Sequence, residues 1–94
     1  MIHFQNVSKN YSNNTIHAAL TDVNFKIIPR EFVSIVGRSG AGKSTLIKLL
    51  IGEEQPSKGR VIFGHYDVGN LKPKQLPEMR RHVGVVFQDF KLLP

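Results

Sequence analysis

The stretch GRSGAGKST spans residues 37–45 and directly follows the apolar run FVSIV at residues 32–36. The run FVSIV has the composition of a strand that is buried on both faces in a parallel sheet. The segment STLIKLLI, residues 44–51, is almost wholly apolar and predicts a helix, which Gly52 is placed to end at the C′ position. The sequence therefore predicts a unit of strand, glycine-rich loop and helix.

The loop itself fits the pattern G-x-x-x-x-G-K-[ST] of a phosphate-binding loop. Backbone N–H groups can wrap a triphosphate only where no Cβ intervenes, which explains Gly40 and Gly42. The start of the following helix directs free amides and its positive dipole end at the phosphates. We expect Lys43 to contact the β and γ oxygens and Ser44 to ligate Mg²⁺. The alternative, a glycine-rich turn with an accidental lysine, leaves the flanking strand and helix unexplained. The predicted nucleotide-contacting set is Gly37, Ser39, Gly40, Ala41, Gly42, Lys43, Ser44 and Thr45, with Thr45 on the α-phosphate side.

The first third of the chain predicts an antiparallel β subdomain, residues 1–31. Residues 2–8 alternate loosely in polarity and predict an edge strand. Residues 9–15, KNYSNNT, have turn composition, and residues 18–28 alternate well enough for a second strand. We expect the two strands to pair as an antiparallel hairpin.

The remainder, residues 32–94, predicts the start of an α/β core. Residues 60–63 predict a short strand, and Pro77 is a plausible helix start. The run VGVVF, residues 83–87, predicts a second buried strand in the sheet that holds residues 32–36. The expected fold is thus an α/β domain with an antiparallel hairpin attached.

Composition excludes several classes of protein and site. The chain has 94 residues, a net charge of +6 and no cysteine, so disulfides and cysteine zinc sites are impossible. The basic residues are dispersed, with Arg80-Arg81 as the only adjacent pair, which favours a solvated basic surface over a nucleic-acid-binding arm. Neither a signal-peptide core nor a run of about 18 apolar residues occurs, so we expect a soluble, cytosolic chain. The histidines lack helical ligand spacing and predict no metal site; they are His3, His17, His65 and His82.

Four segments around and including the loop together resemble the ATP-binding cassette (ABC) family. They are VSKNY (7–11), PREFVSIVGRSGAGKSTLIKLLIG (29–52), PSKG (56–59) and RRHVGVVFQDFKLLP (80–94). The resemblance covers the whole chain and implies a nucleotide-binding domain of the ABC type, with a partial P-loop NTPase core that binds ATP and Mg²⁺. One departure is Arg30, where the family usually carries glycine.

The resemblance implies roles for three further residues. Tyr11 matches the aromatic residue that stacks on adenine, although a tyrosine that packs on the hairpin is the alternative. Gln88 matches the glutamine that contributes to Mg²⁺ and senses the γ-phosphate, the alternative being a polar residue at a strand end. Asp89 follows Gln88 and not the apolar run itself, so we interpret it as a neighbour of Gln88 and not as the Mg²⁺-binding acid.

Other family motifs have no counterpart in these residues: an LSGGQ-like signature, an apolar strand that ends in Asp-Glu, and a later switch histidine. In the family they follow the glutamine, so we expect the N-terminal part of a protein more than twice as long. By themselves the 94 residues are expected to be a marginal domain without ATPase activity. The resemblance implies that the complete protein is a homodimeric ATPase on the cytoplasmic side of the membrane, bound to a transmembrane partner, with cell division as its process. The alternatives are the ATPase of an exporter or lipoprotein-release system, or nucleotide binding alone.

Overall fold

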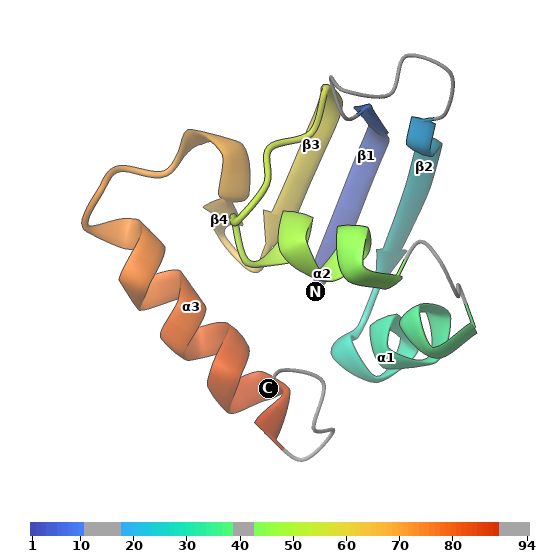
Figure 1. Cartoon of the computed structure of the whole chain (residues 1–94). Coiled ribbons are helices and arrows are strands. Elements are labelled where there is room, and N and C mark those ends of the chain that lie inside the picture. The colour runs from blue at the N-terminus through green and yellow to red at the C-terminus, as the bar shows by residue number, and fades with distance from the viewer. Residues whose placement is uncertain (11–17, 39–42, 89–94) are drawn as a thin grey trace.

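The computed structural model describes residues 1–10, 18–38 and 43–88. Strands β1 to β4 form one antiparallel sheet in the order β2-β1-β3-β4. Helix α2 lies in front of this sheet, α1 follows the lower end of β2, and α3 runs downward from the region of β4 (Figure 1). The elements are β1 (Ile2–Asn10), β2 (Ala18–Ile27), α1 (Pro29–Arg38), α2 (Lys43–Leu50), β3 (Lys58–Phe63), β4 (Tyr66–Asp67), the 3-10 helix η2 (Val68–Asn70) and α3 (Gln75–Val86).

The predicted antiparallel hairpin is confirmed, but the edge position predicted for residues 2–8 is wrong. Phe4 of β1 lies opposite Phe25 of β2 and also opposite Val61 of β3, so β1 is an inner strand. Its alternation looks loose in sequence because Asn6 has a positive φ of 50°, where the register shifts. An inner strand must present apolar residues to the covered face of the sheet, and Phe4 is fully buried there.

The strand predicted at residues 32–36 is a helix in the structure. Phe32 and Val36, four residues apart, are both fully buried, which is the spacing of one helix face. Helix α1 starts with a proline, which suits the first helical position. The Glu31 carboxylate accepts a hydrogen bond from the Ile28 N–H at 3.1 Å, one half of a capping box. A short apolar run fits either state, and here the local helix signals prevail.

The strand predicted at residues 83–87 is also wrong, because most of these residues belong to helix α3. Met79, Val83 and Phe87 are buried at intervals of four residues, whereas Val85 is 71% exposed. A strand buried on both faces would leave no residue of the run in water, so the pattern belongs to the covered side of α3. The described sheet is antiparallel throughout and contains neither predicted core strand.

Helix ends were predicted from turn residues with mixed success. Gly52 ends α2 as predicted, with φ at 75° and the Glu53 N–H donating to the Lys48 carbonyl at 2.9 Å, as in a Schellman motif. The helix predicted to start at Pro77 starts at Gln75 instead. A proline fits anywhere in the first turn of a helix, so it marks the start only to within a turn.

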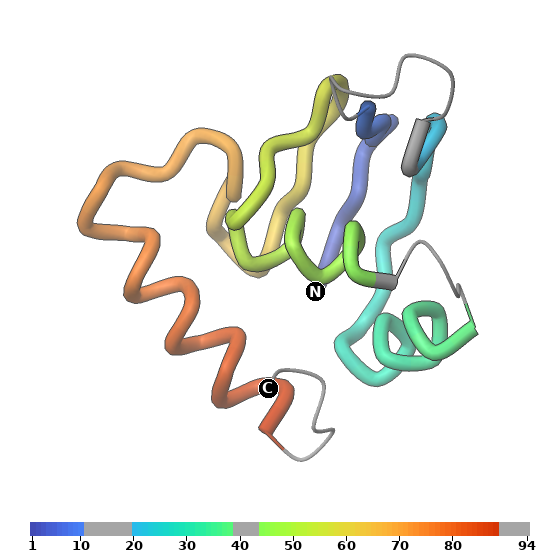
Figure 2. The backbone as a smooth tube through the Cα atoms, in the orientation of Figure 1, coloured from blue at the N-terminus to red at the C-terminus, as the bar shows by residue number. Residues whose placement is uncertain are grey.

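Aromatic rings join the sheet to two of the helices. Phe4 and Phe25 stack with centroids 4.6 Å apart, and Phe32 of α1 lies 6.1 Å from Phe4. Phe87, just beyond α3, lies 5.9 Å from Phe32. Such pairs contribute about 0.5–1.5 kcal/mol each beyond area burial. Figure 2 shows the backbone path of the elements that carry or adjoin these rings, which are β1, β2, α1 and the end of α3.

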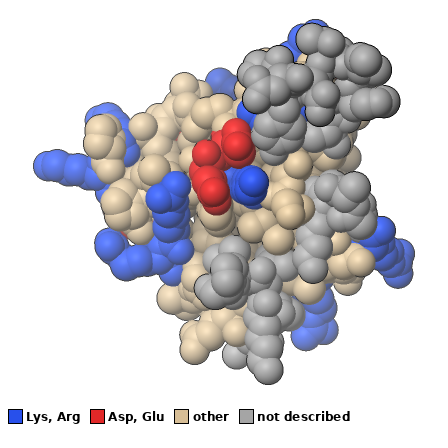
Figure 3. All heavy atoms as spheres, viewed as in Figure 1, with Lys and Arg blue, Asp and Glu red and all other residues tan. Residues whose placement is uncertain are grey.

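On the face drawn in Figure 3, basic side chains lie at several separate places. Lys and Arg side chains are spread mainly around the margin of the face in Figure 3, and one group of acidic side chains lies near its centre. In the part of the chain that the structure describes, no helix is long and apolar enough to cross a membrane.

Candidate functional site

The predicted phosphate loop connects α1 to α2. Gly37, its predicted first residue, lies in the last turn of α1, so the prediction that the loop starts there is wrong. Gly37 is exposed and a Cβ there would meet no atom within 4 Å, so nothing in α1 excludes a side chain. Helix α1 continues to Arg38, so it extends past the end of the predicted strand. Four predicted contacts lie outside the described residues, namely Ser39, Gly40, Ala41 and Gly42.

The start of α2 lies where the sequence predicts a helix to begin. The helix begins at Lys43, whose side chain is outside the described part, and Ser44 is exposed. The first four N–H groups of a helix lack intrahelical acceptors and carry the positive end of the dipole, so this start can accept a phosphate. The exposed Ser44 hydroxyl is accessible to Mg²⁺, whereas Thr45 is buried at 6% exposure. These residues fit an ATP–Mg²⁺ complex at the helix start, and the individual contacts stay predictions.

The residues whose roles the resemblance implies lie at the borders of the described parts of the chain. Tyr11 follows the last residue of β1 and lies outside the described residues. Asp89 follows Gln88 and also lies outside them. Gln88 is exposed and follows Phe87, whose ring packs on Phe32. This packing holds the end of α3 against α1, the helix that leads into the predicted loop. The roles of Gln88 at Mg²⁺ and at the γ-phosphate stay predictions.

Helix α3 is anchored at the opposite end of α2. The Arg80 Nε donates to the Ile51 carbonyl at 2.9 Å, where the α2 carbonyls lack intrahelical donors. A guanidinium at this end also complements the negative end of the helix dipole. Sequence analysis did not predict this contact. The sequence feature that could have indicated this contact is Arg80, a cation directly after Met79 of the buried face. Such a position places the head group at the edge of the covered side of α3, within reach of a neighbouring element.

A second anchor joins α3 to β4. Tyr66 is 2% exposed, and its hydroxyl donates to the Glu78 carboxylate at 2.7 Å and lies 3.4 Å from His82 Nδ1. The hydrogen bond to Glu78, then burial, then the negative charge of Glu78 raise the pKa of Tyr66, and the Arg81 charge opposes them. The trio was not predicted, since its members are far apart in sequence. It fixes the start of α3, and none of its three members is itself a predicted nucleotide contact.

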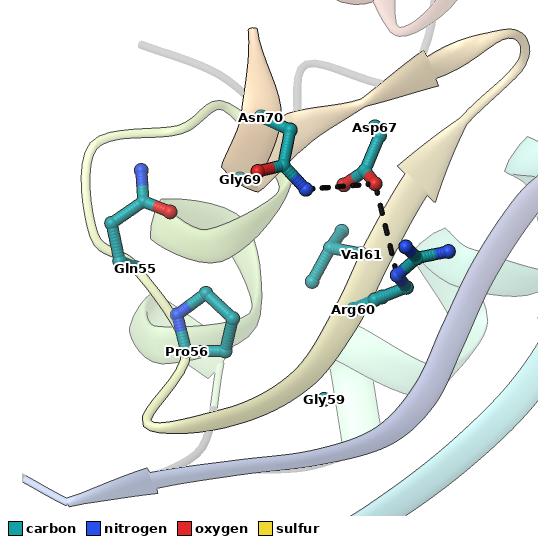
Figure 4. A pocket seen from close by; sticks show the side chains of 8 residues that line it. All are labelled: Gln55, Pro56, Gly59, Arg60, Val61, Asp67, Gly69 and Asn70. Carbon is teal, nitrogen blue, oxygen red and sulfur yellow. Dashed lines mark hydrogen bonds and ion pairs between the residues drawn. The ribbon is translucent and has the colours of Figure 1, made fainter.

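One pocket of about 230 Å³ lies beside the β3–β4 hairpin. In Figure 4, Asp67 lies between Arg60 and Asn70, with an Arg60 Nε to Asp67 Oδ2 distance of 3.8 Å and an Asn70 Nδ2 to Oδ2 distance of 3.1 Å. Its one acid and one base thus face each other. The lining residues are Gln55, Pro56, Gly59, Arg60, Val61, Asp67, Gly69 and Asn70, none of them a predicted nucleotide contact.

Solved structures of ABC cassettes share this fold. The dimeric post-hydrolysis structure of the ATP-binding cassette MJ0796, bound to ADP and Pi, superposes with a TM-score of 0.64 at 27% identity, over 86% of this chain and 35% of that one. CbiO1 from Clostridium perfringens, part of the ABC transporter complex cbiONQ, gives 0.63 at 27% identity, over 84% of this chain and 30% of that one. The predicted fold class, a partial ABC nucleotide-binding domain, is therefore confirmed, although the two predicted core strands are not.

Sequence relatives span the whole chain. The cell division ATP-binding protein FtsE of Bacillus subtilis (strain 168) is 50% identical over 94 residues, which are 100% of this chain and 40% of that protein. The phosphonates import ATP-binding protein PhnC of Lactococcus lactis subsp. cremoris (strain SK11) is 51% identical over 94 residues, again 100% of this chain and 37% of that protein. The chain thus spans about 40% of the length of these relatives. Residues 20–94 match the ABC transporter family, and the chain belongs to that family.

Proposed function

We propose that this chain contributes the phosphate-binding segment of an FtsE-like ABC subunit, which couples ATP binding and hydrolysis to a membrane partner in cell division. The observation that carries the proposal is the sequence pattern from Gly37 to Ser44, together with a helix that starts at Lys43, near the end of this pattern. The 50% identity to FtsE of Bacillus subtilis over the full chain supports the choice within the family.

The start of α2 performs the central binding step in this proposal. Its free amides receive phosphate oxygens, and Lys43 adds a point charge that follows the β and γ groups. Ser44 offers a small exposed hydroxyl to Mg²⁺. Bound ATP–Mg²⁺ supplies the transferable γ-phosphoryl group and the metal charge that neutralises its oxygens. The chain's own contribution is to position that group and to stabilise its negative charge.

Tyr11 and Gln88 provide two further contacts in this proposal. The ring of Tyr11 stacks on the base, an interaction that needs only a π face. Gln88 supplies a neutral amide near Mg²⁺, which can bind or release without leaving a buried charge behind. The Phe32–Phe87 contact supports this placement, because it holds the residue before Gln88 against α1.

The complete protein in this proposal is a homodimer of nucleotide-binding domains on the cytoplasmic side of the membrane, bound through an FtsX-like transmembrane permease. One similar structure is a dimer of an ATP-binding cassette, which supports the homodimer. The net charge of +6 is attributed to a solvated surface, and no nucleic acid is involved.

A second function has specific support. The identity of 51% to PhnC favours an import ATPase whose partner is a phosphonate permease. An exporter or lipoprotein-release ATPase, and a chain that only binds nucleotide, are the further alternatives from the sequence. Purification of the complete protein with its membrane partner distinguishes them: an FtsX-like partner supports the proposal, and a transporter permease overturns the cell-division role.

Substitution of Lys43 tests the nucleotide site. In the complete protein that contains this chain, Lys43→Ala should abolish ATP hydrolysis and weaken ATP binding about tenfold to a hundredfold, the effect of losing a charge-assisted hydrogen bond. The matched control is Lys48→Ala, on the same helix but in its last turn, which should leave binding unchanged. Equal ATP affinity and turnover in Lys43→Ala and the unsubstituted protein would refute the phosphate-loop assignment.

A further inference from the structure

A second pocket lies at the end of the sheet where β1 finishes and β2 and β3 begin. Figure 1 shows these three strand ends together at the upper edge of the sheet. The pocket has a volume of about 220 Å³. Among the described residues its lining consists of Ser8, Asn10, Leu20, Thr21, Ser57 and Lys58, and none of these is a predicted contact of the phosphate loop.

The polar groups of this pocket are held in place by backbone hydrogen bonds. The Ser8 Oγ accepts from the Asp22 N–H at 2.9 Å, and the Ser57 Oγ accepts from the Asn10 N–H at 2.9 Å. A hydroxyl that accepts from the backbone keeps its own proton for donation. The Ser57 hydroxyl lies 3.5 Å from the Asn10 carbonyl, so that proton is only weakly used. Two oriented hydroxyls therefore face a pocket without carboxylates in its lining.

Lys58 supplies a positive charge at the same place. It is exposed at the start of β3 and lies opposite Ser8 in the β1–β3 register. Among the described residues no carboxylate lies within ion-pair distance of Lys58. The neighbouring cation is already engaged, since Lys9 Nζ lies 3.3 Å from Glu54 Oε2 and donates to the Gln55 carbonyl at 2.7 Å. The charge of Lys58 is thus available to a ligand.

We propose that this pocket binds a small oxyanion, a phosphate or a carboxylate-bearing metabolite, through the Lys58 ammonium and the hydroxyls of Ser8, Thr21 and Ser57. One cation, three hydroxyls and the Asn10 amide surround the pocket, and oxyanions are the ligands that accept from all of these donors. The site goes beyond the proposed function, because ATP phosphates are assigned to the start of α2.

Inorganic phosphate is the probe for this site. The complete protein carrying Lys43→Ala is titrated with phosphate at constant ionic strength, so that the predicted phosphate loop does not compete. Backbone amide signals of Asn10 and Asp22 report on the pocket, since both N–H groups are bonded to lining hydroxyls. We expect saturable shifts of these two signals. Titration with acetate in the same background asks whether a carboxylate is accepted as well.

Two variants separate a specific site from general attraction by a basic protein. Lys58→Gln should weaken phosphate binding about fivefold, the upper range for an exposed ion pair. The control, Lys26→Gln, removes an exposed cation of β2 that does not line the pocket and should leave binding unchanged. Shifts that do not saturate, or an equal loss in both variants, would overturn the oxyanion site. Neither outcome bears on the phosphate loop, which is tested by Lys43→Ala alone.

Discussion

Gly59 is the position where a single methyl group should disturb the sheet most. Its φ is 87°, a conformation that costs a residue with a Cβ about 1–2 kcal/mol. A Cβ at Gly59 would also press on the backbone carbonyl oxygens of Gln5 and Asn6, which belong to β1 and cannot rotate away. Overpacking against rigid atoms adds about 1–3 kcal/mol. Gly59→Ala should therefore lower the free energy of unfolding by about 2–5 kcal/mol.

Gly64 provides the matched control, because its φ is 60° and a Cβ there would meet no atom within 4 Å. Gly64→Ala carries the backbone cost alone and should destabilise by about 1–2 kcal/mol. Equilibrium urea unfolding followed by circular dichroism measures both, and the Gly59→Ala midpoint should fall by about 1 M or more. Equal destabilisation by the two substitutions would refute the close contact between the start of β3 and β1.

Three further predictions test the helices and the site. Gly37→Ala should raise the free energy of unfolding by about 0.5–1 kcal/mol, measured by urea unfolding, because Gly37 is an exposed helical residue; destabilisation would contradict the helix there. Tyr66→Phe should reduce the loss of stability at alkaline pH. Because the pKa of Tyr66 is raised in the folded protein, its contribution to stability is complete below about pH 10 and is lost as the pH rises through the pKa of the folded state. Unfolding midpoints that fall equally in both proteins from pH 7 to 11 would contradict this prediction. Gln88→Ala in the complete protein should slow ATP turnover and leave ATP binding nearly intact, whereas a loss confined to binding would make Gln88 an ordinary ligand.

The parts of the fold that were predictable are those with local signals. The β1–β2 hairpin follows from two alternating segments around a polar turn, and both strands form as predicted. The end of α2 follows from Gly52, since only a residue without Cβ adopts its positive φ readily. The covered face of each element can be read in the same way, because alternation or a spacing of four is visible over a few residues.

The two apolar runs were not predictable by their own composition. FVSIV and VGVVF, residues 32–36 and 83–87, are short enough to be either strands or pieces of a helix face. What decides the second run is the spacing from Met79 to Val83, which starts outside the run. For the first run it is the capping hydrogen bond at Glu31. In both cases the deciding residue precedes the apolar stretch that attracts attention.

The contacts that organise the helices around the site arise from tertiary packing. Arg80 reaches Ile51 across a sequence separation of 29, and Tyr66 reaches Glu78 across 12. No local pattern selects these partners, since an exposed arginine and a half-polar tyrosine suit many surfaces. The phosphate loop stays a prediction, and the sequence alone can suggest it because its chemistry needs adjacent residues: glycines for close backbone approach, then a lysine and a hydroxyl at a helix start.

Two relatives with different printed functions are equally similar to the chain. FtsE of Bacillus subtilis and PhnC of Lactococcus lactis are 50% and 51% identical to the chain over the same 94 residues. Both are named as ATP-binding proteins, so the overall identity does not distinguish a cell-division partner from an import partner. Copurification of the membrane partner is consequently the measurement that separates cell division from import, and Lys43→Ala separates both from a chain without nucleotide chemistry.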